Sequence, residues 1–441
     1  MIELFVAAVA GFGIGFVAGI LPGIGVLTML LTFYTLLSDM SLLQLIMTYT
    51  VAMGTTQYFG SVPAIIYGVS GEVTSAPAVR YGHPLFLQGQ GHRLMAVTAT
   101  GSYIAALFGI AIIYFLSKNV MMFTPFLTNN VRAVMFVTTL TILVALADRK
   151  GVSAVMALVG ILAGSIGYNS MFDVRVLVPA HTMFDAGLPA NSVFTGLLVL
   201  PALVHFRNMI TPTAINSDSQ YPSLKTRFLN LLNLQYLPTI TRSAFAGSLM
   251  GLIPGASFAV SSSVSAAVEK KVFGSDDFTT VVAAESSNNS AVVTALIPLL
   301  LLALPIVPSE AFVLGLAESN GFGVQTSYDF FLANINTILA VLLTVSTVNW
   351  IIAGVFYQAA QKIYTVLVPH VYTVLIVFAV LINFYAAYRE NQLLFSAICL
   401  LIFYKLGRII KSDDAKSIFL IAYFVSDELV VSLYHFYLFH V

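Results

Sequence analysis

Apolar positions along this chain form long unbroken stretches instead of alternating with polar ones. A helix of about 20 apolar residues is long enough to cross the hydrocarbon layer of a bilayer. Stretches of roughly this length lie near residues 4–21, 41–57, 94–116, 131–147, 151–168 and 189–206, and again near 237–253, 331–357, 363–387, 391–405 and 416–439. The pattern therefore predicts an all-α polytopic membrane protein.

Shorter apolar pieces lie between these stretches, and Pro or Gly interrupts several of them. They cover residues 24–37, 61–70, 256–268 and 291–307. Membrane helices of this kind are often half-helices that meet inside the bilayer. Together, the long and short pieces predict about 11 to 13 membrane elements.

One long polar loop divides the chain near its middle. Residues 207–235 carry Arg207, Lys225 and Arg227 against the single acidic residue Asp218. A basic loop of this length favours the cytoplasmic side. We therefore expect four parts: a first membrane repeat (1–206), a polar linker loop (207–236), the core of a second repeat (237–330) and C-terminal membrane helices (331–441).

The composition agrees with a membrane protein and excludes several other classes. Hydrophobic residues make up 59% of the 441 residues and charged residues only 9%, against about 25% charged in a soluble protein. The chain has 19 basic and 19 acidic residues, so it has no excess of positive charge that would indicate nucleic-acid binding. The single Cys399 excludes an internal disulfide, and no basic region precedes the first apolar stretch as in a cleaved signal peptide. No phosphate-binding loop or other enzyme signature is present.

An internal repeat is the most informative pattern. Glycines or serines recur every four residues and end in Pro-Gly in both halves, at an offset of 232 residues. The series are Gly11, Gly15, Gly19, Pro22 and Gly23 in the first half and Ser243, Gly247, Gly251, Pro254 and Gly255 in the second. Small residues at this spacing let two helices approach closely. A second pair of expected breaks, at Pro63 and Pro298, has an offset of 235.

Broken helices at matching places in two halves are typical of secondary transporters, whose substrate binds where the breaks meet. Two unrelated glycine-rich packing faces are the alternative interpretation. We expect the halves to be inverted repeats, which requires an odd number of spans in each.

Several of these motifs resemble the TctA-type large membrane subunit of tripartite tricarboxylate transporters, over roughly residues 11–320. The motifs are GILPGIG at 19–25, YFGSVPAI at 58–65, Gly82-His83-Pro84, GLIPG at 251–255, ESSNNSA at 285–291 and Ile297-Pro298-Leu299. The chain departs from the family at four places. These are Ser70 (usually Pro), Tyr81 (usually Asp), His83 (usually Tyr) and Ile306 (usually Gly).

The resemblance implies secondary active uptake of organic carboxylates, such as tricarboxylates or dicarboxylates, with sodium as coupling ion and no other cofactor. It implies a place in the cytoplasmic (inner) membrane, alternating access, a small membrane subunit and an extracytoplasmic substrate-binding protein. Two alternatives remain open: a stand-alone anion permease or channel of related fold, and a non-transporting membrane scaffold. Self-association into a homo-oligomer is also left open.

Carboxylate binding inside a membrane needs helix N-termini, hydroxyls, amides or a cation. The residues we expect to bind substrate are Gly23, Gly25, Ser61, Gly255, Ser257, Asn288, Asn289 and Arg80. The oxygens we expect around sodium belong to Asn288, Asn289, Ser287 and Thr56. The serines have an alternative reading as packing residues, and Arg80 as part of a surface loop.

Two further ionisable residues stand near these positions. Glu285 lies beside an apolar segment, and an ionisable residue within the membrane is a functional candidate by default. Its alternative reading is an interfacial carboxylate that faces water. His83 would make uptake proton-linked if it titrates during transport.

Overall fold

A computed structural model describes most of the chain. The described residues are 2–21, 24–68, 73–119, 129–169, 174–176, 184, 187–209, 223, 235–253, 258–366, 368–389, 391–424, 426 and 429. Pro22, Gly23, Pro254, Gly255 and Ser257 lie outside these ranges, so the predictions made for them stay predictions.

Helices account for nearly all of the described elements. Those of the first half are α1 (Ile2–Ile20), α2 (Val26–Thr32), α3 (Tyr34–Ser38), α4 (Leu42–Phe59), α5 (Ser61–Tyr67), η1 (Val73–Ser75), η2 (Ala78–Gly82), α6 (His83–Leu87), α7 (Gly91–Lys118), α8 (Asn129–Leu146), α9 (Lys150–Gly164), α10 (Ala190–Phe194), η4 (Thr195–Val199) and α11 (Leu200–Met209). Those of the second half are α13 (Leu237–Gly251), α14 (Phe258–Lys271), α15 (Asp277–Thr294), α16 (Leu296–Leu302), α17 (Pro308–Ser319), α18 (Val324–Val366), α19 (Val368–Arg389), α20 (Leu393–Ile409) and α21 (Asp413–Phe424). Two three-residue strands, β1 (Gly167–Asn169) and β2 (Val174–Val176), pair antiparallel.

The predicted class, an all-α polytopic membrane protein, is confirmed. In the described part of the chain, four apolar helical segments are long enough to cross a membrane: Ile2–Ile20, Gly91–Lys118, Thr326–Gly354 and His370–Arg389. Large apolar side chains also point outward; Leu158 and Leu401 are 63% and 62% exposed. Exposed apolar surface of this kind is stable against lipid but costly in water.

Two predicted stretches differ from the helices in their bounds. The apolar piece expected at 291–307 is divided, because α15 ends at Thr294 and α16 begins at Leu296. The boundary expected between 357 and 363 is absent, because α18 continues to Val366. Apolar residues alone do not mark where a buried helix ends, because apolar residues lie on both sides of the boundary between α15 and α16.

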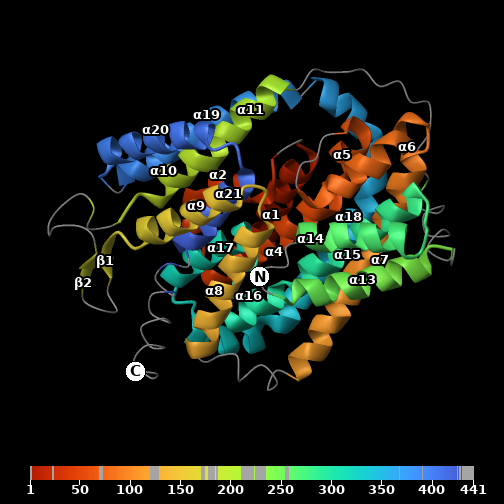
Figure 1. Cartoon of the computed structure of the whole chain (residues 1–441), viewed down its shortest axis with the longest axis horizontal. Coiled ribbons are helices and arrows are strands. Elements are labelled where there is room, and N and C mark those ends of the chain that lie inside the picture. Colours follow the sequence, from red (N-terminus) through yellow and green to blue (C-terminus); the bar gives the residue numbers. More distant parts are fainter. Residues whose placement is uncertain are drawn as a thin grey trace.

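The helices form two groups that are visible in Figure 1. In one, α10, α11, α19 and α20 lie together along one edge. In the other, α7, α13 and α14 pack around α15. Helices α1 and α4 pack against each other near the centre.

The two halves share a local geometry at the predicted proline positions. Helices α5 and α16 each have seven residues and follow a longer helix after one intervening residue, Gly60 or Ala295. Each ends at a left-handed residue, Gly68 (φ 65°) or Ala303 (φ 48°), so the offset is 235 residues throughout. Pro63 and Pro298 both lie in the first turn, where a missing N–H breaks no helical hydrogen bond.

The glycine series lets helices pack backbone to backbone in both halves. A Cβ on Gly15 would overlap the carbonyl oxygen of Ala52, so α1 lies directly against α4. A Cβ on Gly247 would likewise overlap the carbonyl oxygen of Ser287, so α13 lies directly against α15. Such contact between backbones is the structural use of small residues at four-residue spacing.

Candidate functional site

Helix α15 is an unusually polar helix in a fully buried position. Every residue from Thr280 to Thr294 is buried, and these include Glu285, Ser286, Ser287, Asn288 and Asn289. Such side chains must find partners inside the protein, because buried polar groups without hydrogen bonds are costly. The surrounding helices supply most of these partners, so α15 is the central polar helix of the group formed with α7, α13 and α14.

Gln57 of α4 is the centre of a hydrogen-bonded group that reaches α15. Its Oε1 atom accepts hydrogen bonds from Nδ2 of Asn288 at 2.9 Å and from Oγ1 of Thr74 at 3.0 Å. The Ser262 hydroxyl then donates to the backbone oxygen of Thr74 at 2.7 Å. We call Gln57, Thr74, Ser262 and Asn288 the Gln57–Asn288 cluster. It joins α4 and η1 of the first half to α14 and α15 of the second.

Two further contacts flank this cluster along α15. The hydroxyls of Ser261 and Ser287 are 2.6 Å apart and connect α14 to α15. On another side of α15, Nδ2 of Asn289 donates to Oγ of Ser102 on α7 at 3.0 Å and to the backbone oxygen of Glu285 at 3.0 Å. The two predicted asparagines therefore form hydrogen bonds with different helices, Asn288 with α4 and Asn289 with α7.

Some polar atoms of α15 have no hydrogen-bond partner among the described residues. They are both carboxyl oxygens of Glu285, Oγ of Ser286 and Oδ1 of Asn288. A buried acceptor without a donor is a candidate site for a bound ligand or cation, which would supply the missing interaction. The Asn288 side chain thus donates to Gln57 while its oxygen remains available to a bound cation.

The other residues predicted for substrate or sodium have varied surroundings. Ser61 is buried at the first residue of α5, and Gly25 is the extended N-cap residue of α2. The Thr56 hydroxyl lies 3.1 Å from the backbone oxygen of Gly15 and 2.8 Å from that of Ala52, so it also fastens α4 to α1. Arg80 is exposed, and its guanidinium lies 5.3 Å from the centre of the Tyr81 ring.

The sequence pattern did not show which residues of the first half form hydrogen bonds with α15. Gln57 lies with Thr55, Thr56 and Ser61 in a polar run that offers oxygens for sodium, whereas the sequence pattern does not single out Thr74 or Ser102. A signal does exist for Ser102, since Thr98, Thr100 and Ser102 are polar positions inside an otherwise apolar span. Their partners could not be assigned because the contacts join distant segments.

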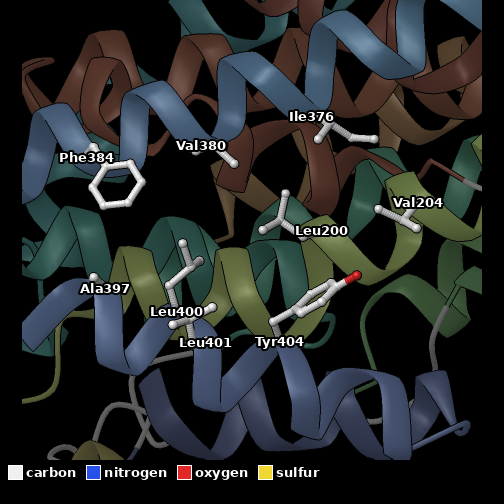
Figure 2. A pocket seen from close by; sticks show the side chains of 9 residues that line it. All are labelled: Leu200, Val204, Ile376, Val380, Phe384, Ala397, Leu400, Leu401 and Tyr404. Carbon is white, nitrogen blue, oxygen red and sulfur yellow. The ribbon is translucent and has the colours of Figure 1, made fainter.

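Two cavities lie elsewhere, where α19 and α20 face earlier segments of the chain. The first, of about 380 Å³, is an apolar groove between α11, α19 and α20, and Figure 2 shows the side chains that line it. Its surface offers hydrocarbon and the ring of Tyr404, which suits an acyl chain better than a carboxylate. The second, of about 250 Å³, is polar and lies beside Asn191, Ser192 and Asn383. Neither is lined by a residue of the Gln57–Asn288 cluster.

Comparison with known proteins points in the same direction as the motifs. The profile of the tripartite tricarboxylate transporter TctA family matches residues 5–421. A curated relative from Agrobacterium vitis, described as an uncharacterized 52.8 kDa protein in the TAR-I ttuC' 3' region, is 24% identical over 320 residues. This alignment covers 69% of the present chain and 62% of the relative, less than two thirds of the relative's length. No solved structure matches the chain.

Proposed function

Since the chain belongs to the tripartite tricarboxylate transporter TctA family, we propose that it is the membrane subunit that carries organic carboxylates across the bilayer by secondary active transport. The family is one of transporter components, not of enzymes. Its match extends over nearly the whole chain, and the membrane-length helices fit an integral multi-pass protein. The proposed substrates are tricarboxylates or dicarboxylates such as citrate.

The observation that carries the proposal is the Gln57–Asn288 cluster. It places amides and hydroxyls from both halves of the chain in one buried site. Carboxylates are bound inside proteins by such donors, together with backbone N–H groups at helix starts. Helix α2 begins at Val26 after Gly25, and α14 begins at Phe258, so a new helix starts shortly after each Pro-Gly motif.

Sodium is the proposed coupling ion. Sodium sites in broken-helix transporters are built from carbonyl, hydroxyl and amide oxygens. Asn288 has an unpartnered amide oxygen, Ser287 and Asn289 lie beside it in the sequence, and Thr56 precedes Gln57. In this proposal they offer oxygens for sodium on two sides of α15, since Asn288 faces Gln57 on α4 and Asn289 faces Ser102 on α7. Transport by alternating access would then require α15 and α4 to separate, which breaks the bond between Asn288 and Gln57.

The proposal includes partners and a location. A small membrane subunit and an extracytoplasmic substrate-binding protein would complete the transporter in the cytoplasmic membrane, as the family's tripartite name implies. A stand-alone permease would instead transport carboxylate without them, and a scaffold would not transport at all.

A binding experiment tests the proposed site without requiring transport. Purified protein would be heated with citrate, tartrate, succinate or acetate, with and without sodium, and its unfolding temperature measured. Preferential binding to the folded state raises that temperature. We expect a di- or tricarboxylate to stabilise the wild type, and to stabilise it less after Asn288→Ala.

Asn334→Ala is the matched control, because among the described residues this half-buried asparagine of α18 bonds only to Phe330 of its own helix. Equal stabilisation of the wild type and the Asn288 variant by every carboxylate would remove the cluster from the binding site. Stabilisation of neither protein by any carboxylate would count against the proposed substrate class.

A further inference from the structure

Three acidic side chains are buried in the described part of the chain, namely Glu269, Glu285 and Glu310, at 2%, 1% and 1% exposure. Glu269 is balanced by Arg242, whose Nη2 lies 2.7 Å from its Oε1 atom. Glu310 caps the start of α17, where its Oε2 atom accepts from the backbone N–H groups of Ile306 at 2.7 Å and Val307 at 3.3 Å. Two of the three carboxyl groups therefore have a structural reason to be buried.

Glu285 has no such reason. Neither of its carboxyl oxygens has a hydrogen-bond partner among the described residues, and no ion pair of the described part involves it. An ionised carboxylate buried alone is very costly, so it must take up a cation or a proton. Glu285 lies in the middle of α15, far from either helix end, so the partial positive charge at the helix N-terminus does not stabilise its carboxylate.

The cations on the elements packed against α15 are engaged away from Glu285. Arg80 lies over Tyr81, Arg93 over Phe278, Arg242 beside Glu269, Lys118 over Tyr114 and Lys270 beside Asp277, while Lys271 is exposed. The neutral titratable groups nearby also have other contacts. His92 faces Phe86, Tyr58 donates to Ala99, Tyr49 contacts Ser309 and Tyr103 stacks on Trp350.

Glu285 lies one helical turn before Asn288 and Asn289 on α15, and Asn288 belongs to the proposed substrate site. The amide of Asn289 donates to the backbone oxygen of Glu285, and the adjacent Ser286 hydroxyl has no partner in the described residues. Asn288, three residues on, bonds to Gln57. A change of charge at Glu285 would therefore act on the helical turn that holds the cluster together.

We propose that Glu285 is the carboxylate that binds the coupling cation, a single positive charge in the form of a proton or a sodium ion. This inference rests on the proposed function and assigns the coupling to one side chain. When the cation is bound, Glu285 carries no net charge and the substrate-loaded protein can change conformation. When it is absent, the buried negative charge opposes that change, so carboxylate and cation move together.

Glu285→Gln separates coupling from transport, because it keeps the shape of the side chain and removes its charge. Full-length protein in proteoliposomes, with its partner subunits where the wild type needs them, would be assayed for two activities. One is exchange of labelled carboxylate between equal concentrations on both sides. The other is accumulation against a gradient, driven by tenfold inward gradients of sodium or of protons at zero membrane potential.

A tenfold cation gradient is worth about 1.4 kcal/mol per coupled ion, which supports about tenfold accumulation at one-to-one coupling. We expect Glu285→Gln to keep exchange and to lower accumulation to about equal concentrations inside and outside. Glu310→Gln is the matched control, because this carboxyl is equally buried but caps a helix. It should accumulate substrate like the wild type. The gradient that drives wild-type accumulation identifies the cation as sodium or a proton.

Two results would overturn the assignment while leaving carboxylate transport intact. One is wild-type accumulation by Glu285→Gln. The other is loss of both activities by a folded Glu285→Gln protein, which would place the side chain in the substrate site or the fold. A wild type that exchanges no carboxylate would instead overturn the proposed function itself.

Discussion

The side-chain amide of Asn288 donates a hydrogen bond of 2.9 Å to Oε1 of Gln57, although the two residues are 231 positions apart. Both side chains are buried, at 0% and 2% exposure. The bond connects the last turn of α4 in the first half to the second half of α15. A contact of this kind joins the two halves in the arrangement that the structure shows.

We expect Gln57→Ala and Asn288→Ala each to raise the KM for carboxylate about tenfold, equivalent to about 1.4 kcal/mol of lost binding. The double variant should cost less than the two single changes combined, since both remove the same contact. Initial uptake rates over a range of substrate concentrations would provide these values. Fully additive effects would contradict a shared role.

Asn289→Ala should weaken activation by sodium more than it weakens substrate binding. The Asn289 amide nitrogen donates to Ser102 and to the backbone oxygen of Glu285, which fixes the orientation of the side chain. We expect the sodium concentration for half-maximal uptake to rise about tenfold, as when one ligand is lost. Titration of uptake with sodium checks this, with Asn334→Ala as control. An unchanged sodium curve would remove Asn289 from the ion site.

Gly247→Val should destabilise the fold, because its side chain would overlap the carbonyl oxygen of Ser287 and the hydroxyl of Ser290. Overpacking of this kind typically costs about 1–3 kcal/mol. Gly13→Val on α1 is the control, since a Cβ there meets no atom within 4 Å. Thermal unfolding in detergent should show a lower midpoint for the Gly247 variant alone. Equal midpoints would show that α13 and α15 are not in such close contact.

Ala303→Gly should stabilise the protein. Ala303 ends α16 in the left-handed region, at φ 48°, which costs a residue with a Cβ about 1–2 kcal/mol. The matching position at the end of α5 is already Gly68. The same unfolding measurement should therefore show a higher midpoint for Ala303→Gly and a lower one for Gly68→Ala. A lower midpoint for Ala303→Gly would contradict the left-handed assignment.

Sequence patterns predicted the membrane class and many helix positions, because lipid-facing helices must be apolar along their whole length. They did not predict a helix over 277–294, because its polar residues break the apolar pattern and their partners lie on other helices, α4, α7 and α14. For the same reason, Asn288 and Asn289 were identified as a pair but not as contacts to different helices. The roles of Gly23, Gly255 and Ser257 stay predictions, as does the inversion of the two halves.

Arg80 shows a further limit of local patterns. Its sequence neighbours suggested either an anion ligand or a surface loop, and residue type alone does not distinguish them. In the structure it is exposed and stacked on Tyr81, and among the described residues no hydrogen bond or ion pair joins it to the Gln57–Asn288 cluster. Its part in substrate binding remains a prediction.

Uptake of labelled citrate and a panel of mono- and dicarboxylates into proteoliposomes tests the central claim most directly. It would be measured with and without an inward sodium gradient, and with or without the candidate partner subunits. We predict sodium-stimulated uptake of a di- or tricarboxylate that Asn288→Ala impairs. Absence of uptake of every carboxylate, under all of these conditions and with correctly inserted protein, would contradict the assignment as a carboxylate transporter.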